Sequence, residues 1–216
     1  MAGTRNIFLI GNTGAMKTAI CHEVEKLKKF QILNFGEILR KAMIEDTPDA
    51  HIIRAYQFLG RISPFDITAS IFKTRAICIN FDKPFLISSF PLIPKEFHLI
   101  RNYTTRSALQ NSVFYVLDTS ITDVQNNLKY KYICNACGHA RYLAEEQLKS
   151  NDIISCSCGE QLTEFNSSNY IRKHFFTSFV ELSEISNELE ISGLEVKHVN
   201  LSQTSVEEFV QKLPIE

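Results

Sequence analysis

Gly11-Asn12-Thr13-Gly14-Ala15-Met16-Lys17-Thr18 is the segment from which the architecture of this chain is inferred. It matches the phosphate-loop pattern G-x-x-x-x-G-K-[ST] at every fixed position except Met16, where the pattern has glycine. In such a loop, backbone N–H groups and the start of the next helix surround phosphate oxygens, and the lysine adds a positive charge. A side chain at Met16 crowds the phosphates or requires a backbone conformation that glycine adopts more easily. The alternative interpretation is an ordinary glycine-containing turn between a strand and a helix.

The residues on both sides of this segment favour the phosphate loop. Asn6–Ile10 is a largely apolar run that ends at the first glycine, as a buried parallel strand does. On the other side, Ile20, Val24 and Leu27 recur with helical spacing, which predicts an amphipathic helix to about Lys29. A strand before the loop and a helix after it are the context that a phosphate loop requires.

Strand-like and helix-like runs alternate along most of the remaining chain. Further strands are predicted at Gln31–Phe35, Pro84–Phe90, Val113–Asp118 and Glu195–Leu201. Further helices are predicted around Glu37–Ile44, His51–Leu59 and Tyr170–Leu189. This alternation predicts an α/β fold with a parallel sheet that is covered by helices on both faces.

Three hydroxyl residues, each followed by an acid three residues later, predict helix starts. They are Ser63 with Asp66, Ser120 with Asp123, and Thr204 with Glu207. In the first, Ser63 is the predicted N-cap and Pro64 the first helical residue. The second precedes Val124–Leu128, and the third begins a terminal helix.

The composition limits the class of protein. The chain has 216 residues, a formal net charge of −1 and 44% hydrophobic residues, which is typical of a globular protein with a real core. No apolar run approaches the roughly 18 residues that a membrane helix needs, and no signal peptide is expected. The near-neutral charge gives no global attraction to nucleic acid or to an anionic membrane. The expected setting is the cytosol or another reducing compartment.

Four clustered cysteines interrupt the strand–helix alternation between about Lys129 and Phe165. Cys134-x2-Cys137 is followed, after eighteen residues, by Cys156-x-Cys158. Two ligand pairs on two short turns can close around one tetrahedral Zn²⁺, which predicts a structural site. The alternatives are disulfides, which a reducing compartment disfavours, and an incomplete site. The six histidines form no ligand cluster in the sequence, and His139 is interpreted as a surface residue, with metal ligation beside the cysteine turn as the alternative.

Several motifs, in their order and spacing, resemble the adenylate kinase family nearly end to end. Leu33–Arg40 is similar to S-T-G-D-M-L-R, Gly60–Pro64 to G-x-L-V-P, Phe85–Leu92 to F-L-L-D-G-F-P-R, and Ile133–Gly138 to the metal-containing lid of many bacterial members. Val113–Ile121 resembles the strand before the lid, and Asn200–Leu213 the closing strand and helix.

The resemblance implies a P-loop NTPase three-layer sandwich with two smaller parts. The core domain would comprise residues 1–30, 61–128 and 166–216, the monophosphate-binding flap 31–60, and the zinc-binding lid 129–165. The implied reaction is reversible transfer of the ATP γ-phosphoryl group to AMP with Mg²⁺. Lid closure would exclude water from this reaction.

The resemblance also implies which residues bind and act. The nucleotide-binding residues would be Gly11, Gly14, Lys17, Thr18, Gly36 and Arg40. Lys17 and Arg40 are the implied catalytic residues, with Lys131 and Arg172 as further candidates, and the metal ligands would be Cys134, Cys137, Cys156 and Cys158.

The chain departs from the family pattern at several phosphate-binding positions. Ser88 stands where the family has the aspartate that organises Mg²⁺, and Leu92 where it has an arginine that holds the monophosphate. Asn127 and Lys131 fall at two further arginine positions, so that only the second keeps a positive charge. One such arginine is worth roughly 10³–10⁵ in rate. Asp118 is a candidate substitute for the lost acid, or it caps the turn after its strand.

Three functional hypotheses follow. The chain is a divergent nucleoside-monophosphate kinase that acts on ATP and AMP. Alternatively, it is a pseudoenzyme, a nucleotide-binding or structural subunit of a larger assembly. The third hypothesis is a nucleic-acid-associated protein that uses the zinc turns, and the net charge of −1 argues against it.

Overall fold

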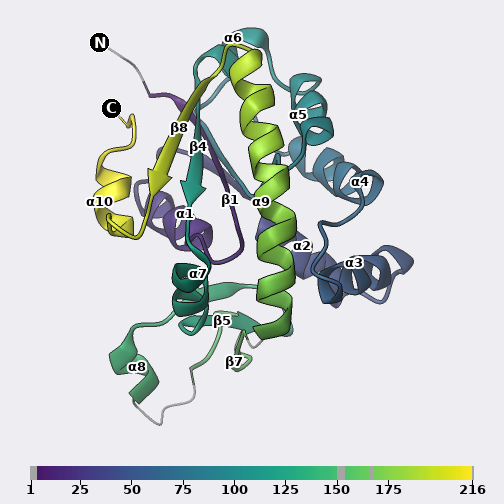
Figure 1. The fold of residues 1–216 in the computed structure, drawn as a ribbon, viewed down its shortest axis with the longest axis vertical. Helices are drawn as coiled ribbons and strands as arrows, with labels where there is room; N and C mark the ends of the chain where they lie inside the picture. Colours follow the sequence, from purple (N-terminus) through teal and green to yellow (C-terminus); the bar gives the residue numbers. More distant parts are fainter. Residues whose placement is uncertain (1–3, 150–153, 166–167, 216) are drawn as a thin grey trace.

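A five-stranded parallel sheet forms the centre of the protein in the computed structural model, which describes residues 4–149, 154–165 and 168–215 (Figure 1). The spatial order of the strands is β2-β3-β1-β4-β8, with β1 in the middle. Their bounds are β1 Asn6–Gly11, β2 Gln31–Asn34, β3 Phe85–Ser88, β4 Ser112–Asp118 and β8 Glu195–Asn200. All four pairings are parallel, as the alternation of strands and helices predicts.

Helices cover both faces of this sheet. On one face lie α1 Lys17–Lys26 and α10 Val206–Gln211 (Figure 1). The other face carries α2 Phe35–Ile44, α4 Phe65–Ala76, α5 Pro94–Arg101 and the long α9 Ser168–Ile191. Completing the set are α3 Pro48–Phe58, α6 Arg106–Gln110, α7 Ile121–Leu128 and α8 Glu145–Lys149. This arrangement confirms the predicted α/β fold.

The alternation of side chains along β1 divides the core into two halves. Ile7 and Leu9 pack with α1 and α10, whereas Phe8 and Ile10 point into the opposite, larger half. Phe8 stacks on Phe114 of β4 with ring centroids 4.3 Å apart. All of these side chains are fully buried. The central strand is therefore fixed from both faces, and so is the loop that follows it.

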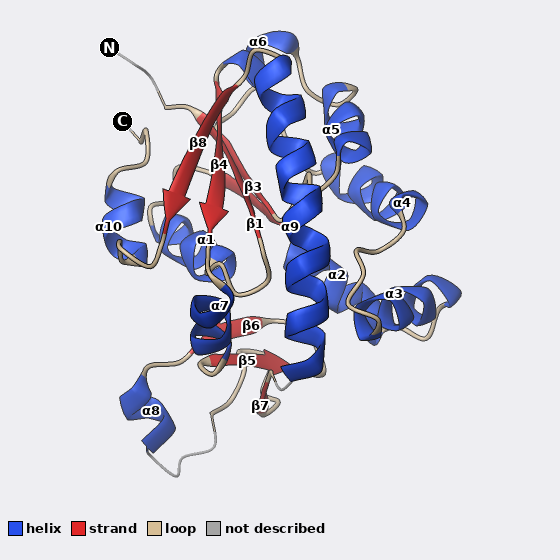
Figure 2. Cartoon of the chain, in the orientation of Figure 1, coloured by secondary structure: helices blue, strands red, loops and turns tan. Residues whose placement is uncertain are grey.

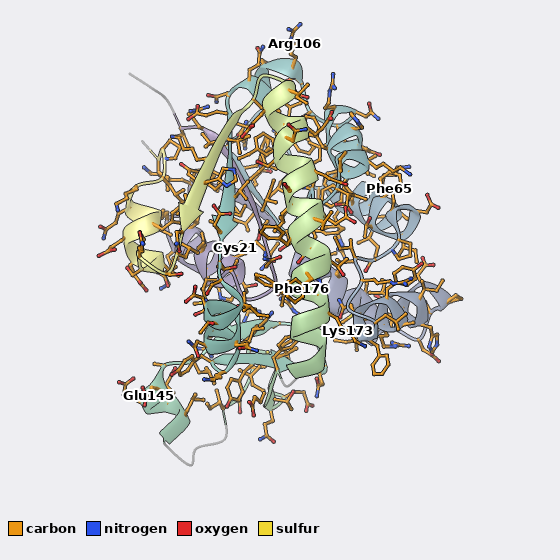
Figure 3. All side chains as sticks on the ribbon, viewed as in Figure 1. Cys21, Phe65, Arg106, Glu145, Lys173 and Phe176 are labelled. Carbon is orange, nitrogen blue, oxygen red and sulfur yellow. The ribbon has the colours of Figure 1, made fainter. Side chains whose placement is uncertain are left out.

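A second, three-stranded antiparallel sheet lies beyond the carboxyl ends of the main strands (Figure 2). It is built from β5 Lys131–Cys134, β6 Ala140–Tyr142 and β7 Leu162–Glu164, in the order β6-β5-β7. Glu145 of α8 lies on its outer side, at the opposite end of the molecule from Arg106 of α6 (Figure 3). We refer to residues 129–165 as the lid segment.

The long helix α9 connects this sheet back to the core. At Gly60, just after α3, a Cβ atom would lie 2.4 Å from the Cβ of Lys173 on α9, so that only glycine permits this contact. Gly60 also has a φ of +70°, which glycine adopts without strain. Lys173 lies near the lid end of α9 (Figure 3).

Two of the three predicted helix caps are wrong by one residue. The helix α4 begins at Phe65 and not at Pro64, because Pro64 has an extended ψ of 139° and only its carbonyl joins the helix. Ser63 makes no capping bond there. In α10 the cap is Ser205, whose hydroxyl accepts from the Glu208 N–H at 3.1 Å.

The third predicted cap is confirmed, since Ser120 and Asp123 form a capping box at α7. The first predicted helix ends earlier than expected, at Lys26, and Leu27 is 42% exposed. The sequence Thr204-Ser205-Val206-Glu207-Glu208 contains the cap pattern in two registers, so that the pattern alone does not choose between them.

The correction at α10 gives a stability test. Ser205→Ala should lower the free energy of unfolding by about 1 kcal/mol, because it removes the acceptor for a helix N–H. Thr204→Ala should change it by less than about 0.5 kcal/mol. Urea unfolding followed by circular dichroism measures both, and a larger loss for Thr204→Ala would contradict the assigned cap.

Candidate functional site

The phosphate-loop segment lies at the carboxyl end of β1, between the ends of β3 and β4. This edge of a parallel sheet is where α/β proteins bind ligands. Gly14 has a φ of +90°, and a Cβ there would lie 2.9 Å from Val124 of α7. The Asn127 amide donates to the Gly14 carbonyl at 2.9 Å. The packing of α7 against the loop therefore fixes its position and requires glycine at position 14.

Met16 occupies the left-handed region of backbone space, with φ 53° and ψ 12°. This conformation costs a residue with a side chain roughly 1–2 kcal/mol, whereas glycine adopts it freely. The Met16 carbonyl still begins α1, since it accepts from the Ile20 N–H at 3.0 Å. The loop thus keeps the backbone path that glycine favours, at a cost in conformational energy.

Lys17 points back along the loop and is buried. Its ammonium donates to the carbonyls of Gly11 at 2.5 Å and Asn12 at 2.7 Å. Burial lowers the pKa of Lys17 to about 7, and the Arg40 guanidinium adds a smaller effect in the same direction. A bound anion would stabilise the charged form of this side chain.

Two more cations, from distant parts of the chain, reach the same place. Arg40 comes from α2, and its Nε donates to the Gly138 carbonyl of the lid segment at 2.9 Å. Lys131 comes from β5, with its ammonium 4.6 Å from the centroid of the Phe165 ring. Burial lowers the pKa of Lys131 well below its usual value, and Arg40 and Lys17 lower it further.

These three cations surround one cavity of about 120 Å³ at the loop. No aspartate or glutamate is among the described residues that line it. Such a cavity favours an anion with several oxygens, which phosphate groups provide. Typical ligand pockets measure roughly 300–1,000 Å³. In this arrangement the lid segment therefore leaves room for less than a whole nucleotide.

The structure places the sequence-predicted binding residues as follows. Those that line the cavity are Gly11, Gly14, Lys17, Thr18, Gly36, Arg40 and Lys131. Leu92, at an expected arginine position, also lines it, while Ser88 is fully buried behind its neighbour Ser89, which does line it. The side chain of Arg172 lies outside what the structure describes.

Asp118, the candidate substitute for the missing acid, lies elsewhere. Its carboxylate pairs with Nδ1 of His198 at 3.0 Å, and it lines a separate cavity of about 600 Å³ between α9 and the ends of β4 and β8. The Thr18 hydroxyl does line the cavity at the loop, and a threonine at this position of a phosphate loop can contact Mg²⁺. The described cavity lining consequently does not supply the carboxylate that Mg²⁺ prefers in proteins.

Sequence reasoning missed several residues of the cavity wall. They are Gln57 of α3, Tyr142 of β6, and His174 and Ser178 of α9. Burial, together with the nearby Lys17 ammonium, lowers the pKa of His174 to about 4, so that the ring is neutral beside the cations. Burial also raises the pKa of Tyr142. None of them belongs to a local motif, and only the fold brings them to the loop.

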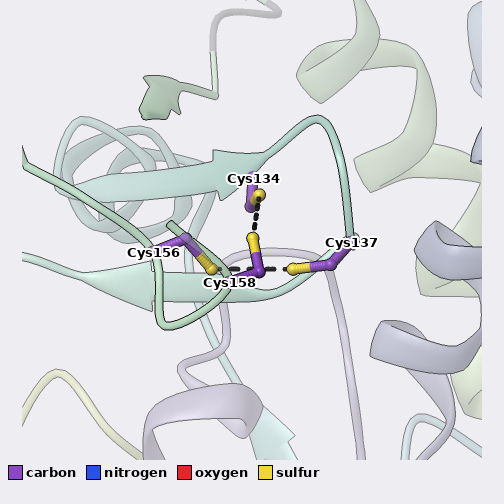
Figure 4. A group of neighbouring side chains, drawn as sticks. All are labelled: Cys134, Cys137, Cys156 and Cys158. Atoms are coloured by element: carbon purple, nitrogen blue, oxygen red, sulfur yellow. Dashed lines mark hydrogen bonds between the residues drawn. The ribbon is translucent and has the colours of Figure 1, made fainter. Parts of the chain in front are cut away.

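The four predicted cysteine ligands meet at one point of the lid segment (Figure 4). The sulfur atoms of Cys134 and Cys158 are 3.5 Å apart, and those of Cys137 and Cys156 are 3.6 Å apart. A disulfide requires about 2.05 Å, so these thiols are free. Tetrahedral zinc with Zn–S bonds of about 2.3 Å separates its sulfurs by about 3.8 Å.

A backbone hydrogen bond closes each of the two cysteine turns. The Gly138 N–H donates to the Cys134 carbonyl, and the Gly159 N–H to the Cys156 carbonyl, each at 2.9 Å. The backbone N–H of Cys158 lowers the pKa of Cys156, which favours its thiolate, whereas contacts among the thiols raise the pKa of Cys137 and Cys158. The second cysteine pair has one residue fewer between its cysteines than the first pair. The four sulfurs still converge, and the donor set fits one zinc ion.

Among the described residues, none of the helices has the length and apolar character needed to cross a membrane.

Comparison with known proteins gives relatives of one kind. The chain is 28% identical to the adenylate kinase of Staphylococcus aureus over 159 residues, which are 72% of each chain. It is 25% identical to that of Staphylococcus epidermidis over 157 residues, again 72% of each. The adenylate kinase of Lactobacillus delbrueckii subsp. bulgaricus is 23% identical over 133 residues, 62% of this chain and 61% of that one. No family model matches the chain.

The parallel sheet is covered by helices on both faces, and a loop with a buried lysine joins its central strand β1 to the helix α1. Together these features define a P-loop kinase fold. Within that class, the chain is similar to the adenylate kinases of these bacteria. This similarity supports a nucleotide-kinase-like function.

Proposed function

We propose that this protein binds ATP and AMP and transfers the γ-phosphoryl group between them. One observation carries the proposal: Lys17, Arg40 and Lys131 converge on a single cavity at the phosphate loop without an acid in its described lining. Phosphoryl transfer needs positioning and neutralisation of charge more than covalent chemistry from the protein. Three converging cations meet that need in part.

The proposed division of labour follows the origin of each cation. The core, residues 1–30, 61–128 and 166–216, would hold the ATP phosphates with Lys17 and the loop N–H groups. The flap, residues 31–60, would hold the monophosphate with Arg40. The lid, residues 129–165, would bring Lys131 over the transferred group. Mg²⁺ would enter as part of its complex with ATP, touching the protein through the Thr18 hydroxyl.

A second candidate function has a specific observation in its favour. The described cavity lining lacks a carboxylate, Leu92 supplies no charge, and Asn127 bonds to the loop instead of to a ligand. A protein of this kind would bind nucleotide without turnover, as a nucleotide-binding or structural subunit of an assembly. Loss of one transition-state arginine costs roughly 10³–10⁵ in rate, so that the two candidates differ in a measurable way.

A coupled assay for ADP formation from ATP, AMP and Mg²⁺ distinguishes them. The proposal expects turnover above about 1 per second, the low end for kinases, and its loss in Lys17→Ala. Lys129→Ala is the matched control, because Lys129 is exposed and its side chain bonds only to Asn126 among the described contacts. ATP binding by calorimetry with no ADP formation would reject the proposal in favour of the second candidate.

The pKa of Lys17 gives a pH test of nucleotide binding. In the free protein this pKa is about 7, and bound phosphates raise it because they stabilise the ammonium. Binding then takes up a proton above pH 7, so the ATP association constant should fall as the pH rises from about 7.5 to 9.5, by at most about tenfold per unit. Lys17→Arg, which stays charged, should reduce the slope to the part that comes from Lys131, whose pKa is also lowered at this cavity. A flat profile for the wild-type protein would contradict the assignment.

We also propose that the four cysteines hold one structural zinc ion. All four ligands are protein thiolates, so the ion would fold the lid and leave no position for catalysis. Protein purified under reducing conditions should carry about one zinc ion that survives gel filtration. Cys158→Ser should lose it, and Cys78→Ser, which alters an exposed cysteine outside the cluster, should keep it. Elemental mass spectrometry measures the content, and metal-free wild-type protein would overturn the assignment.

A further inference from the structure

Three potential metal ligands meet at a point that the cysteine cluster does not include. They are His22 of α1, Glu37 of α2, and His139, which follows the first cysteine turn of the lid segment. One donor atom from each lies within 4.8 Å of the other two. No histidine cluster is visible in the sequence, because these residues are separated by fifteen and then by more than a hundred positions, and only the fold brings them together.

One donor pair of this group already has the spacing of neighbouring metal ligands. Nδ1 of His139 lies 3.2 Å from Oε1 of Glu37. A tetrahedral zinc ion with bonds of about 2.0–2.1 Å separates neighbouring donors by about 3.3–3.4 Å. The rings of His22 and His139 stack, with centroids 5.1 Å apart and planes at 22°. All three side chains are half-buried, so that they are held in place and remain open to solvent.

We propose that His22, Glu37 and His139 form a second binding site for a divalent transition metal ion, with zinc as the expected occupant. Two imidazoles and one carboxylate are a zinc donor set, and imidazole also suits copper, nickel and iron. The ion would take the place of the proton shared by His139 and Glu37. Its fourth position would carry water from the groove.

The surroundings indicate an exchangeable ion. The group opens onto a groove of about 560 Å³, which gives an entry path. Glu25, one helical turn after His22, faces the same groove and adds negative charge, whereas Lys41 and Arg75 add positive charge. With one anionic ligand against four thiolates, this site should bind zinc more weakly than the cysteine cluster and should fill second.

An ion at this site would join three segments of the chain. The helix α1 begins with Lys17, α2 carries Arg40, and His139 belongs to the lid segment. Next to His139, Gly138 already packs on α2 so closely that a Cβ would lie 2.7 Å from the Lys41 nitrogen. The metal would stabilise this contact and hold the lid segment against α1 and α2. This inference concerns the ion alone and is independent of phosphoryl transfer.

Zinc binding to the reduced full chain, measured by equilibrium dialysis, tests the proposal. Wild-type protein should bind one more ion than His22→Gln, Glu37→Gln and His139→Gln, while every variant keeps the tightly held ion. His51→Gln is the matched control, because His51 pairs with a single carboxylate, that of Asp46, at 3.0 Å. It should bind as the wild type does. Equal stoichiometry in wild type and His22→Gln would overturn the proposal.

Amide hydrogen exchange provides a second readout. Saturation with zinc beyond the first equivalent should slow exchange in residues 131–142 of the wild-type protein, because the ion restrains opening of the lid segment. His22→Gln decides the matter if His139→Gln disturbs the cysteine turn, since His22 belongs to a separate helix. Circular dichroism confirms that each variant is folded. If zinc still slows amide exchange in His22→Gln, the proposed metal site is rejected.

Discussion

The buried ammonium of Lys17, bonded to the carbonyls of Gly11 and Asn12, is the interaction around which the rest of the structure is arranged. Two backbone oxygens satisfy its N–H groups only if β1, the loop and α1 keep one backbone path. The core on both faces of β1 fixes the strand, and the packing of α7 on Gly14 fixes the loop. The local phosphate-loop pattern therefore depends on packing from distant parts of the chain.

The same interaction explains the electrostatics of the cavity. Burying a charge is costly, and the cavity that Lys17, Arg40 and Lys131 line has no aspartate or glutamate in its described lining. The depressed pKa values of both lysines are the result. The lid segment is held in place despite this repulsion by contacts such as the hydrogen bond from Arg40 to the Gly138 carbonyl. A bound phosphate would add negative charge next to these side chains, so this cavity favours an anionic ligand.

Much of this could be predicted from sequence because the signals are local. The loop, the strand before it and the cysteine turns each lie within a few residues, and the family motifs follow in order. His174 and Tyr142 carry no such signal, since they reach the cavity through a helix and a strand whose own patterns concern packing. The capping error at α10 has a different origin, because Thr204 and Ser205 offer the same pattern one residue apart.

The departures at Met16 and Ser88 have different physical consequences. Met16 adopts the left-handed backbone conformation that glycine favours. Methionine in place of glycine therefore costs stability, while the loop keeps its backbone path. Ser88 keeps the strand buried but removes a carboxylate that no described residue of the cavity replaces. The first change affects how firmly the loop is held, whereas the second affects the chemistry after phosphates arrive. Binding and catalysis can therefore diverge in this protein, because the fold depends on the lysine and the backbone, and turnover depends on side chains that the fold does not need.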